Sequence, residues 1–100
     1  MRLIIGGTIR VPEEHIETLK PHIQALMAAT QAEAGCEVFV FTKDLADPGL
    51  IRLFEIWRDQ AALDQHLTSP HIVEWRRIGA QYGVSDRRLT IYDIAGERPF

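Results

Sequence analysis

The chain is short of several residue types, and each shortage excludes a class of protein. Cys36 is the only cysteine, which excludes an intrachain disulfide and a zinc site built from several cysteines. The 11 Lys and Arg residues are outnumbered by 14 Asp and Glu, and the formal net charge of -3 leaves no basic footprint for nucleic acid. No apolar run reaches membrane-spanning length, and the N-terminus lacks the layout of a signal peptide. We therefore expect a cytoplasmic protein with no nucleic-acid or membrane partner.

What is present is an ordinary globular composition. Hydrophobic residues make up 46% of the sequence and charged residues 25%, both usual for a folded soluble domain. With 100 residues, the chain is long enough for one hydrophobic core and too short for two domains. We expect residues 1–100 to form a single domain.

Hydrophobic periodicity and capping residues divide the chain into seven elements. Strands are expected at residues 2–11, 36–43, 50–58 and 87–94, and helices at 12 to about 33, 60–67 and 70–82. Asp59 and Ser69 are good N-caps for the second and third helices, and Gly83 is a typical stop. The order is β-α-β-β-α-β with the second helical segment broken in two. This order predicts an α+β, ferredoxin-like split βαβ fold with one four-stranded antiparallel sheet.

The strands are apolar on both of their faces. Val38 and Val40 lie on one face of their strand, and Phe39 and Phe41 on the other. In a monomer with helices on one side, the second face of an antiparallel sheet would be polar. A second copy of the same sheet is the simplest cover, so we expect a homodimer formed through the sheet face.

Side chains capable of chemistry are concentrated between residues 50 and 75. The third strand carries Glu55 and Trp57, the next helix carries His66, and the third helix carries His71 and Trp75 one turn apart. The rest of the chain reads as a scaffold around them.

Three short motifs in this arrangement resemble those of antibiotic biosynthesis monooxygenase domains. They are a Glu-x-Gly-Cys entry to the second strand at 33–36, a Glu-x-Trp at 55–57, and an Ala-Leu-x-x-His at 62–66 followed by Ser-Pro-His at 69–71. The resemblance spans nearly the whole chain. Its strength comes from the three motifs together, because they occur in the same order and at matching spacings. It implies a ferredoxin-like domain that dimerises into an α/β barrel.

The resemblance also implies an activity. At its enzymatic end the family oxygenates phenols, quinols or anthrone-like polyketides with O₂ and without a metal or flavin, so we expect no cofactor. Such chemistry needs a base that removes an acidic proton from the aromatic, groups that stabilise the resulting anion, and a dry apolar slot. The expected partners are therefore a small aromatic substrate and O₂.

His66 is the first candidate for the base, because imidazole titrates near neutral pH. The alternative is a structural histidine that ties its helix to the sheet. Glu55 is costly to bury unless it is paired. It either orients His66, as a second catalytic residue, or pairs across strands or a dimer seam with one of four arginines: Arg2, Arg10, Arg52 or Arg88. We favour the arginine pairing slightly.

The remaining candidates are assigned to substrate binding. Each could instead have a structural role, such as core packing, a dimer contact, helix capping or a solvated surface position. These candidates are Trp57, Phe39, Trp75, Arg76, His71 and Tyr92.

No metal is expected. His66 and His71 are five residues apart across a proline, whereas a helical ligand pair is four apart. The haem-degrading branch of the superfamily carries an Asn in its first strand, followed later by a Trp and a haem-binding His. The matching places here are Gly6 or Gly7, His66 and Arg76, which argues against haem.

Two other functions remain open because one fold serves many activities. The first is a dimeric barrel that binds a small aromatic without transforming it. The second is an isomerase or lyase that uses His66 and Glu55 for proton transfer without O₂.

Overall fold

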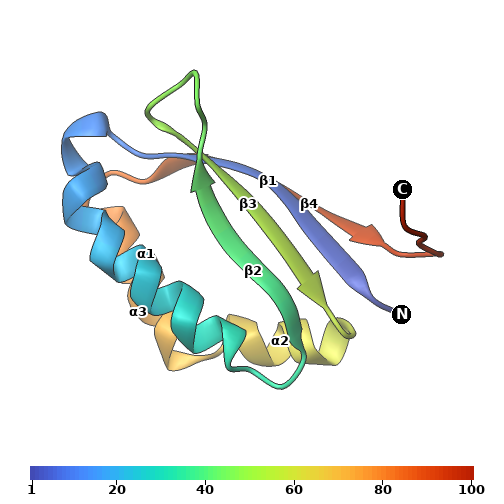
Figure 1. Ribbon diagram of the computed structural model, residues 1–100. Helices are drawn as coiled ribbons and strands as arrows, with labels where there is room; N and C mark the ends of the chain where they lie inside the picture. Colours follow the sequence, from blue (N-terminus) through green and yellow to red (C-terminus); the bar gives the residue numbers. More distant parts are fainter.

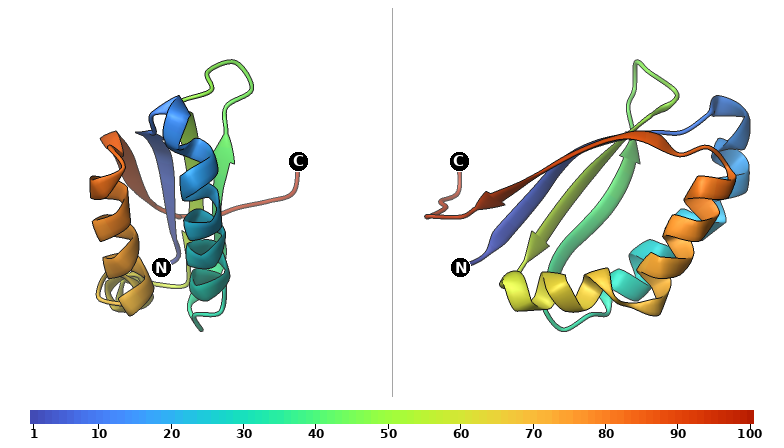
Figure 2. Two further views of the ribbon diagram at one scale, coloured as in Figure 1. Left: turned by 90° about the vertical axis from the view of Figure 1, so that its left-hand side faces the viewer. Right: turned by 180° about the vertical axis from the view of Figure 1, so that it is seen from behind.

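The structure is a computed structural model that describes residues 1–100. Its eight elements are β1 (Leu3–Arg10), a 3-10 turn η1 (Glu13–His15), α1 (Ile16–Gln31), β2 (Cys36–Lys43), β3 (Leu50–Trp57), α2 (Gln60–Leu67), α3 (Pro70–Gln81) and β4 (Ser85–Asp93). The four strands form one antiparallel sheet in the order β2-β3-β1-β4. All helices lie on one face of that sheet and leave the other bare (Figures 1 and 2). The predicted α+β, ferredoxin-like fold is confirmed.

The element boundaries differ from the prediction by two or more residues at the first helix and at the start of β4, and by at most one residue elsewhere. The first helix begins as a 3-10 turn and ends at Gln31, two residues before the expected end at 33. Strand β4 begins at Ser85, two residues earlier than expected. Its first residues are polar and exposed, and Asp86 has a positive φ of 49°, so neither alternation nor β propensity marks the start of this strand.

The hydrophobic core lies between the sheet and the helices. Alternate residues of β1 and β3 point to the helices and are buried, as the period of a strand requires. The same face of β2 contributes Phe39, which is 2% exposed. The largest contributors from the helices and the connection to η1 are Val11, Leu19, Leu26, Leu63, Ile72, Trp75 and Ile78.

Gly7 marks the closest approach of β1 and β4. Its φ is +153°, and a Cβ placed there would overlap the backbone carbonyl of Arg88. The ladder between the two strands shifts register just beyond this point, between Thr8 and Arg10. The glycine therefore serves strand pairing.

The bare face of the sheet is apolar across all four strands. The register places Val40 beside Phe54 on β3, Val38 beside Ile56, and Ile56 beside Ile4 of β1. Tyr92 continues the row on β4, opposite Ile4. We call this set, Ile4, Val38, Val40, Phe54, Ile56 and Tyr92, the outer face. Phe54 and Tyr92 are 43% and 56% exposed, large fractions for aromatic side chains.

None of the helices is both long and apolar enough to cross a membrane.

Candidate active site

The site is built where α2 and α3 meet the end of α1. Asp59 starts α2 by accepting a hydrogen bond from the backbone N–H of Ala62 at 2.8 Å. Ser69 starts α3 by accepting from the backbone N–H of Ile72, and its own hydroxyl donates to the carbonyl oxygen of His66 at 2.7 Å. Both expected caps are confirmed. Together they fix the corner that presents His66 and His71.

Gly35 brings the turn after α1 into contact with this corner. A Cβ at residue 35 would overlap the side chain of Ala62, so only glycine allows the turn to lie this close to α2. The carbonyl of Gly35 also accepts from the N–H of Arg58 at 2.8 Å, which ties the turn to the end of β3. His66 lies one helical turn beyond Ala62 on the same face of α2. Glu33, two residues before the glycine, is thereby placed beside it.

A single oxygen of Glu33 joins both histidines. Oε2 of Glu33 lies 2.7 Å from Nδ1 of His66 and 2.8 Å from Nε2 of His71. A carboxylate oxygen only accepts, so each of these ring nitrogens carries the hydrogen. In a neutral His66 ring, Nε2 is then the nitrogen with the free lone pair. The carboxylate therefore sets the tautomer in which His66 can act as a base.

The imidazole of His66 is buried among aromatic rings. Only 2% of the residue is exposed, and its ring centroid lies 4.7 Å from that of Trp57 and 5.3 Å from that of Phe39. Burial lowers the pKa of His66, and the hydrogen bond that its Nδ1–H donates to Glu33 partly opposes this fall in pKa. The ring is consequently neutral at physiological pH and ready to accept a proton.

Glu55 is held by an indole and not by an arginine. Its Oε1 accepts from Nε1 of Trp57 at 2.9 Å, and the residue is 5% exposed. Burial raises the pKa of this carboxyl, and the Trp57 hydrogen bond and the Arg87 charge oppose the rise. Within the chain the favoured prediction of an arginine ion pair is wrong, since all four candidate arginines pair with other acids. Nor is Glu55 the residue that orients His66, because Glu33 does so.

An inner cavity of about 50 Å³ lies between the sheet and the α2–α3 corner. His66 and Glu55 both line it, so one base and one carboxyl with pKa values displaced in opposite directions face the same space. The other walls are mostly apolar and include Phe39, Phe41, Trp75 and Arg87.

An outer pocket of about 220 Å³ lies on the other side of Trp75. Trp75 and Arg87 line both spaces, and Arg76 lines the outer one. Neither Arg76 nor Arg87 takes part in an ion pair, although six other arginines do. The outer pocket therefore carries two guanidinium groups without an ion-pair partner next to an indole, together with Asp86, which pairs with Arg88.

Comparison with known proteins assigns this arrangement to a family. The model of the family described as antibiotic biosynthesis monooxygenase matches residues 2–78. The chain belongs to this family. A "putative antibiotic biosynthesis monooxygenase" from Deinococcus radiodurans has a crystal structure similar to this one, with a TM-score of 0.89 and 25% identity over 100% of this chain and 98% of that chain.

Two further proteins are similar to this chain. The structure of Rv0793 from Mycobacterium tuberculosis matches with a TM-score of 0.82 and 25% identity over 99% of this chain and 100% of that one. Its sequence, named "Putative monooxygenase Rv0793", is 38% identical over 58% of this chain and 56% of its own length. An uncharacterised Synechocystis protein is 27% identical over 93% of this chain and 63% of its own. The chain thus spans about three fifths of the length of the curated relatives that it matches.

The structure gathers five of the eight predicted site residues at the inner cavity and places the other three outside it. Phe39, Trp75, Glu55 and His66 line the inner cavity. Trp57 is completely buried and supports the site from behind by bonding Glu55 and stacking on His66. The last three predicted residues lie outside the inner cavity: His71 contacts Glu33, Arg76 lines the outer pocket, and Tyr92 lies on the outer face, where it cannot line either space.

Glu33 and Arg87 were not identified as site residues from the sequence. Glu33 belongs to the family motif at 33–36, but the motif by itself assigns no role to this acid. The third residue of that motif, Gly35, packs closely on α2. A glycine at this position could have indicated that Glu33 lies next to the helix that carries His66. Arg87 carries no comparable signal, because β4 has no alternating pattern at its start.

Glu33, His66 and His71 are also the group that could hold a metal ion. Their ligand atoms lie within 4.8 Å of one another. The five-residue spacing across Pro70 therefore does not keep the two rings apart, because both contact Glu33. At 2.7 and 2.8 Å the two contacts have the length of charge-assisted hydrogen bonds. The expectation of no metal stays a prediction.

Proposed function

We propose that this chain is a monooxygenase that acts on small phenolic, quinol or anthrone-like aromatics, uses O₂ and needs no cofactor. The observation that carries the proposal is the contact between Glu33 and Nδ1 of His66 at 2.7 Å, beside an apolar cavity. It leaves Nε2 as a base whose strength is supported by a partly buried carboxylate. Family membership supports the reaction class.

The substrate ring belongs in the outer pocket, because the inner cavity is too small for it. An apolar cavity that holds benzene measures roughly 150 Å³, whereas the inner cavity has about 50 Å³ and the outer pocket about 220 Å³. The ring would lie against Trp75 in the outer pocket, and its acidic group would have to reach past Trp75 into the inner cavity, which His66 lines. Arg76 and Arg87 would stabilise the anion formed when that proton leaves. The inner cavity has room for O₂.

The reaction balances without an external reductant for a substrate with a reactive methylene group. Nε2 of His66 takes a proton from the aromatic, and the delocalised carbanion reacts with O₂ to form a carbon–oxygen bond. The resulting peroxide takes up a proton from the imidazolium. Loss of the second C–H proton with cleavage of the O–O bond gives the ketone and water, so that R₂CH₂ + O₂ yields R₂C=O + H₂O. The substrate supplies all four electrons.

We further propose that the protein, as a single domain, forms a homodimer through the outer face. Its apolar residues run across all four strands, and no helix of the same chain covers them (Figure 2). A face of this kind is stable in water when a second copy covers it. The cytoplasmic location also stays a prediction, which cell fractionation would check.

The function is tested by O₂ uptake with a panel of quinols, hydroxynaphthalenes and anthrones. We expect uptake with at least one of them, retained after dialysis against a chelator. His66→Ala should lower kcat/KM by about 100-fold or more, the usual contribution of a positioned base. His22→Ala, on the exposed side of α1, is the matched control and should leave it unchanged. Equal turnover by His66→Ala and the wild type would remove the assigned role of His66.

The shared cavity of Glu55 and His66 also supports a second function. A carboxyl with a raised pKa and an imidazole with a lowered one suit proton shuttling in an isomerase. Product analysis without O₂ separates the two functions. A product formed anaerobically favours the isomerase, and binding without any product favours a non-catalytic aromatic-binding module.

A further inference from the structure

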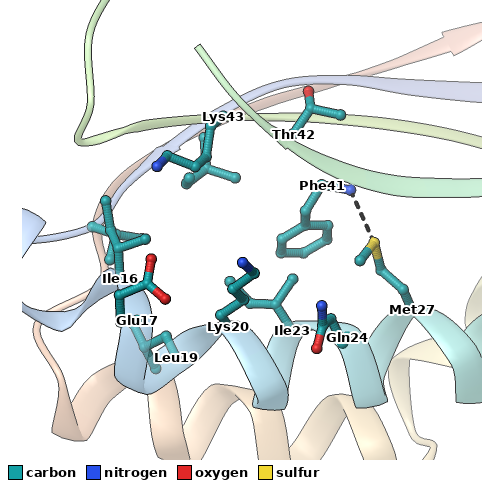
Figure 3. Close-up of a pocket in the computed structure, with 12 residues that line it drawn as sticks. Ile16, Glu17, Leu19, Lys20, Ile23, Gln24, Met27, Phe41, Thr42 and Lys43 are labelled. Atoms are coloured by element: carbon teal, nitrogen blue, oxygen red, sulfur yellow. Dashed lines mark hydrogen bonds between the residues drawn. The ribbon is translucent and has the colours of Figure 1, made fainter. Parts of the chain in front are cut away.

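A second binding groove lies between α1 and the edge strand β2, away from the His66 site. It has a volume of about 250 Å³, five times that of the inner cavity. Its floor is formed by apolar residues of α1, β2 and β3, and Figure 3 shows the ring of Phe41 standing in its centre above Ile23. The remaining apolar lining residues are Val11, Ile16, Leu19, Met27 and Ile51. The groove is large enough for a fused aromatic ring pair.

The rim of this groove carries both lysines of the chain. Lys20 rises from α1 and Lys43 extends from β2, so that the two ammonium groups border the opening (Figure 3). Neither lysine takes part in an ion pair. Glu17 is the only acid in the lining, so the rim has an excess of one positive charge. An apolar floor under two unpaired cations is complementary to an anion with an apolar body.

One wall of the groove can adapt to a ligand. The N–H of Phe41, on the open edge of β2, donates only to the sulfur of Met27 at 3.4 Å. A thioether is a weak acceptor, and methionine is the most flexible of the apolar side chains. Met27 and Phe41 can therefore move apart at low cost.

We propose that the α1–β2 groove binds a small aromatic carboxylate as a second ligand, distinct from the substrate at His66. The ring would lie on Ile23 and against Phe41. The carboxylate would sit between Lys20 and Lys43, with the Gln24 amide as a further donor from the rim.

Phe41 also links the groove to the catalytic side. It lines both the groove and the inner cavity, and its ring packs edge-on against Trp75 at 5.9 Å between centroids. A ligand that displaces Phe41 changes the wall of the inner cavity. This consequence for turnover rests on the proposed function, whereas the binding itself does not.

The test uses 2-naphthoate as the probe and its neutral carboxamide as the matched ligand, followed by calorimetry and amide NMR on the full chain. We expect naphthoate to bind more tightly than the carboxamide and to shift the signals of α1 and β2. Replacing both lysines by Gln should weaken naphthoate binding by about fivefold and leave carboxamide binding unchanged. Arg98→Gln, which removes an exposed positive charge in the C-terminal tail, is the control and should have no effect.

Arg76 supplies the discriminating variant, because naphthoate could instead be drawn to the outer pocket. Binding that Arg76→Gln weakens and the lysine replacements do not would overturn the proposal, as would no binding at all. These measurements need no turnover, so they remain decisive even where the protein consumes no O₂. Where it does, naphthoate should change kcat in the wild type and not in the double lysine variant.

Discussion

At the residue scale, the central contact of the site is made by Glu33. Its Oε2 accepts a hydrogen bond from each of two imidazoles. Its carboxylate raises the pKa of His66 against the opposing effect of burial. Glu33→Gln keeps the size of the side chain and removes its charge. We expect the pKa of His66 to fall further, so the acidic limb of the kcat/KM profile should move to lower pH. The plateau should drop by about tenfold or more, because the imidazolium loses its counter-charge.

The measurement is the pH profile of O₂ uptake for both proteins. The sign follows from the base role: activity requires neutral His66, so it is lost as pH falls through the pKa of His66 and is full above it. Glu74→Gln, an exposed acid on α3, is the control. A limb that stays in place with Glu33→Gln would contradict a role of Glu33 in setting the pKa of His66.

Thr30 illustrates the cost in stability of burying a hydroxyl group without a hydrogen-bond partner. It is completely buried in the last turn of α1, and its Oγ1 finds no hydrogen-bond partner among the protein's own groups. Thr30→Val removes the hydroxyl and keeps the shape. We expect an unchanged or higher free energy of unfolding, by up to about 2 kcal/mol, measured by urea titration. Thr18→Val, on the exposed side of α1, corrects for helix propensity. A clear loss of stability in Thr30→Val alone would show that the hydroxyl is bonded after all.

At the element scale, the position of α2 depends on Gly35. A methyl group at residue 35 would overlap the side chain of Ala62 and push the turn after α1 away from α2. We expect Gly35→Ala to lower the free energy of unfolding by about 1–3 kcal/mol, as overpacking does. It should also lower kcat/KM, because Glu33 moves with the turn. Gly96→Ala, where nothing lies within 4 Å, should change neither quantity. A fully active Gly35→Ala would mean that the contact with Glu33 is dispensable.

The elements themselves could largely be predicted from the sequence, since their signals are local. Caps such as Asp59 and Ser69, and the alternation of β3, depend on neighbouring residues only. The Glu33–His66 contact could not be predicted this way. The two residues are separated by 33 positions and meet through the close approach of Gly35 to α2, which is a tertiary event. The partner of Glu55 was predicted wrongly for a different reason. The indole of Trp57 is local, two residues along the same strand face, but the prediction favoured a charged partner.

At the scale of the whole molecule, the sheet has one face buried by helices and one apolar face left bare (Figure 1). The sequence predicts both apolar faces, because the residues that alternate along the strands are apolar on either side of the sheet. The fold therefore determines where a second copy can bind. Helices occupy one side of the sheet, so a dimer interface of this kind has only the outer face available.

Phe54 lies in the middle of the outer face, between Gly6 of β1 and Val40 of β2, and is 43% exposed. We expect the wild type to have twice the chain mass of 11.4 kDa in light scattering and Phe54→Glu to be a monomer, because two charges would be buried against each other at the two-fold interface. Val73→Glu places the same charge on an apolar residue that is 55% exposed on α3, and it should stay dimeric. A Phe54→Glu protein that remains a dimer would move the interface away from the sheet. A monomeric wild type would leave the apolar outer face without the cover proposed here.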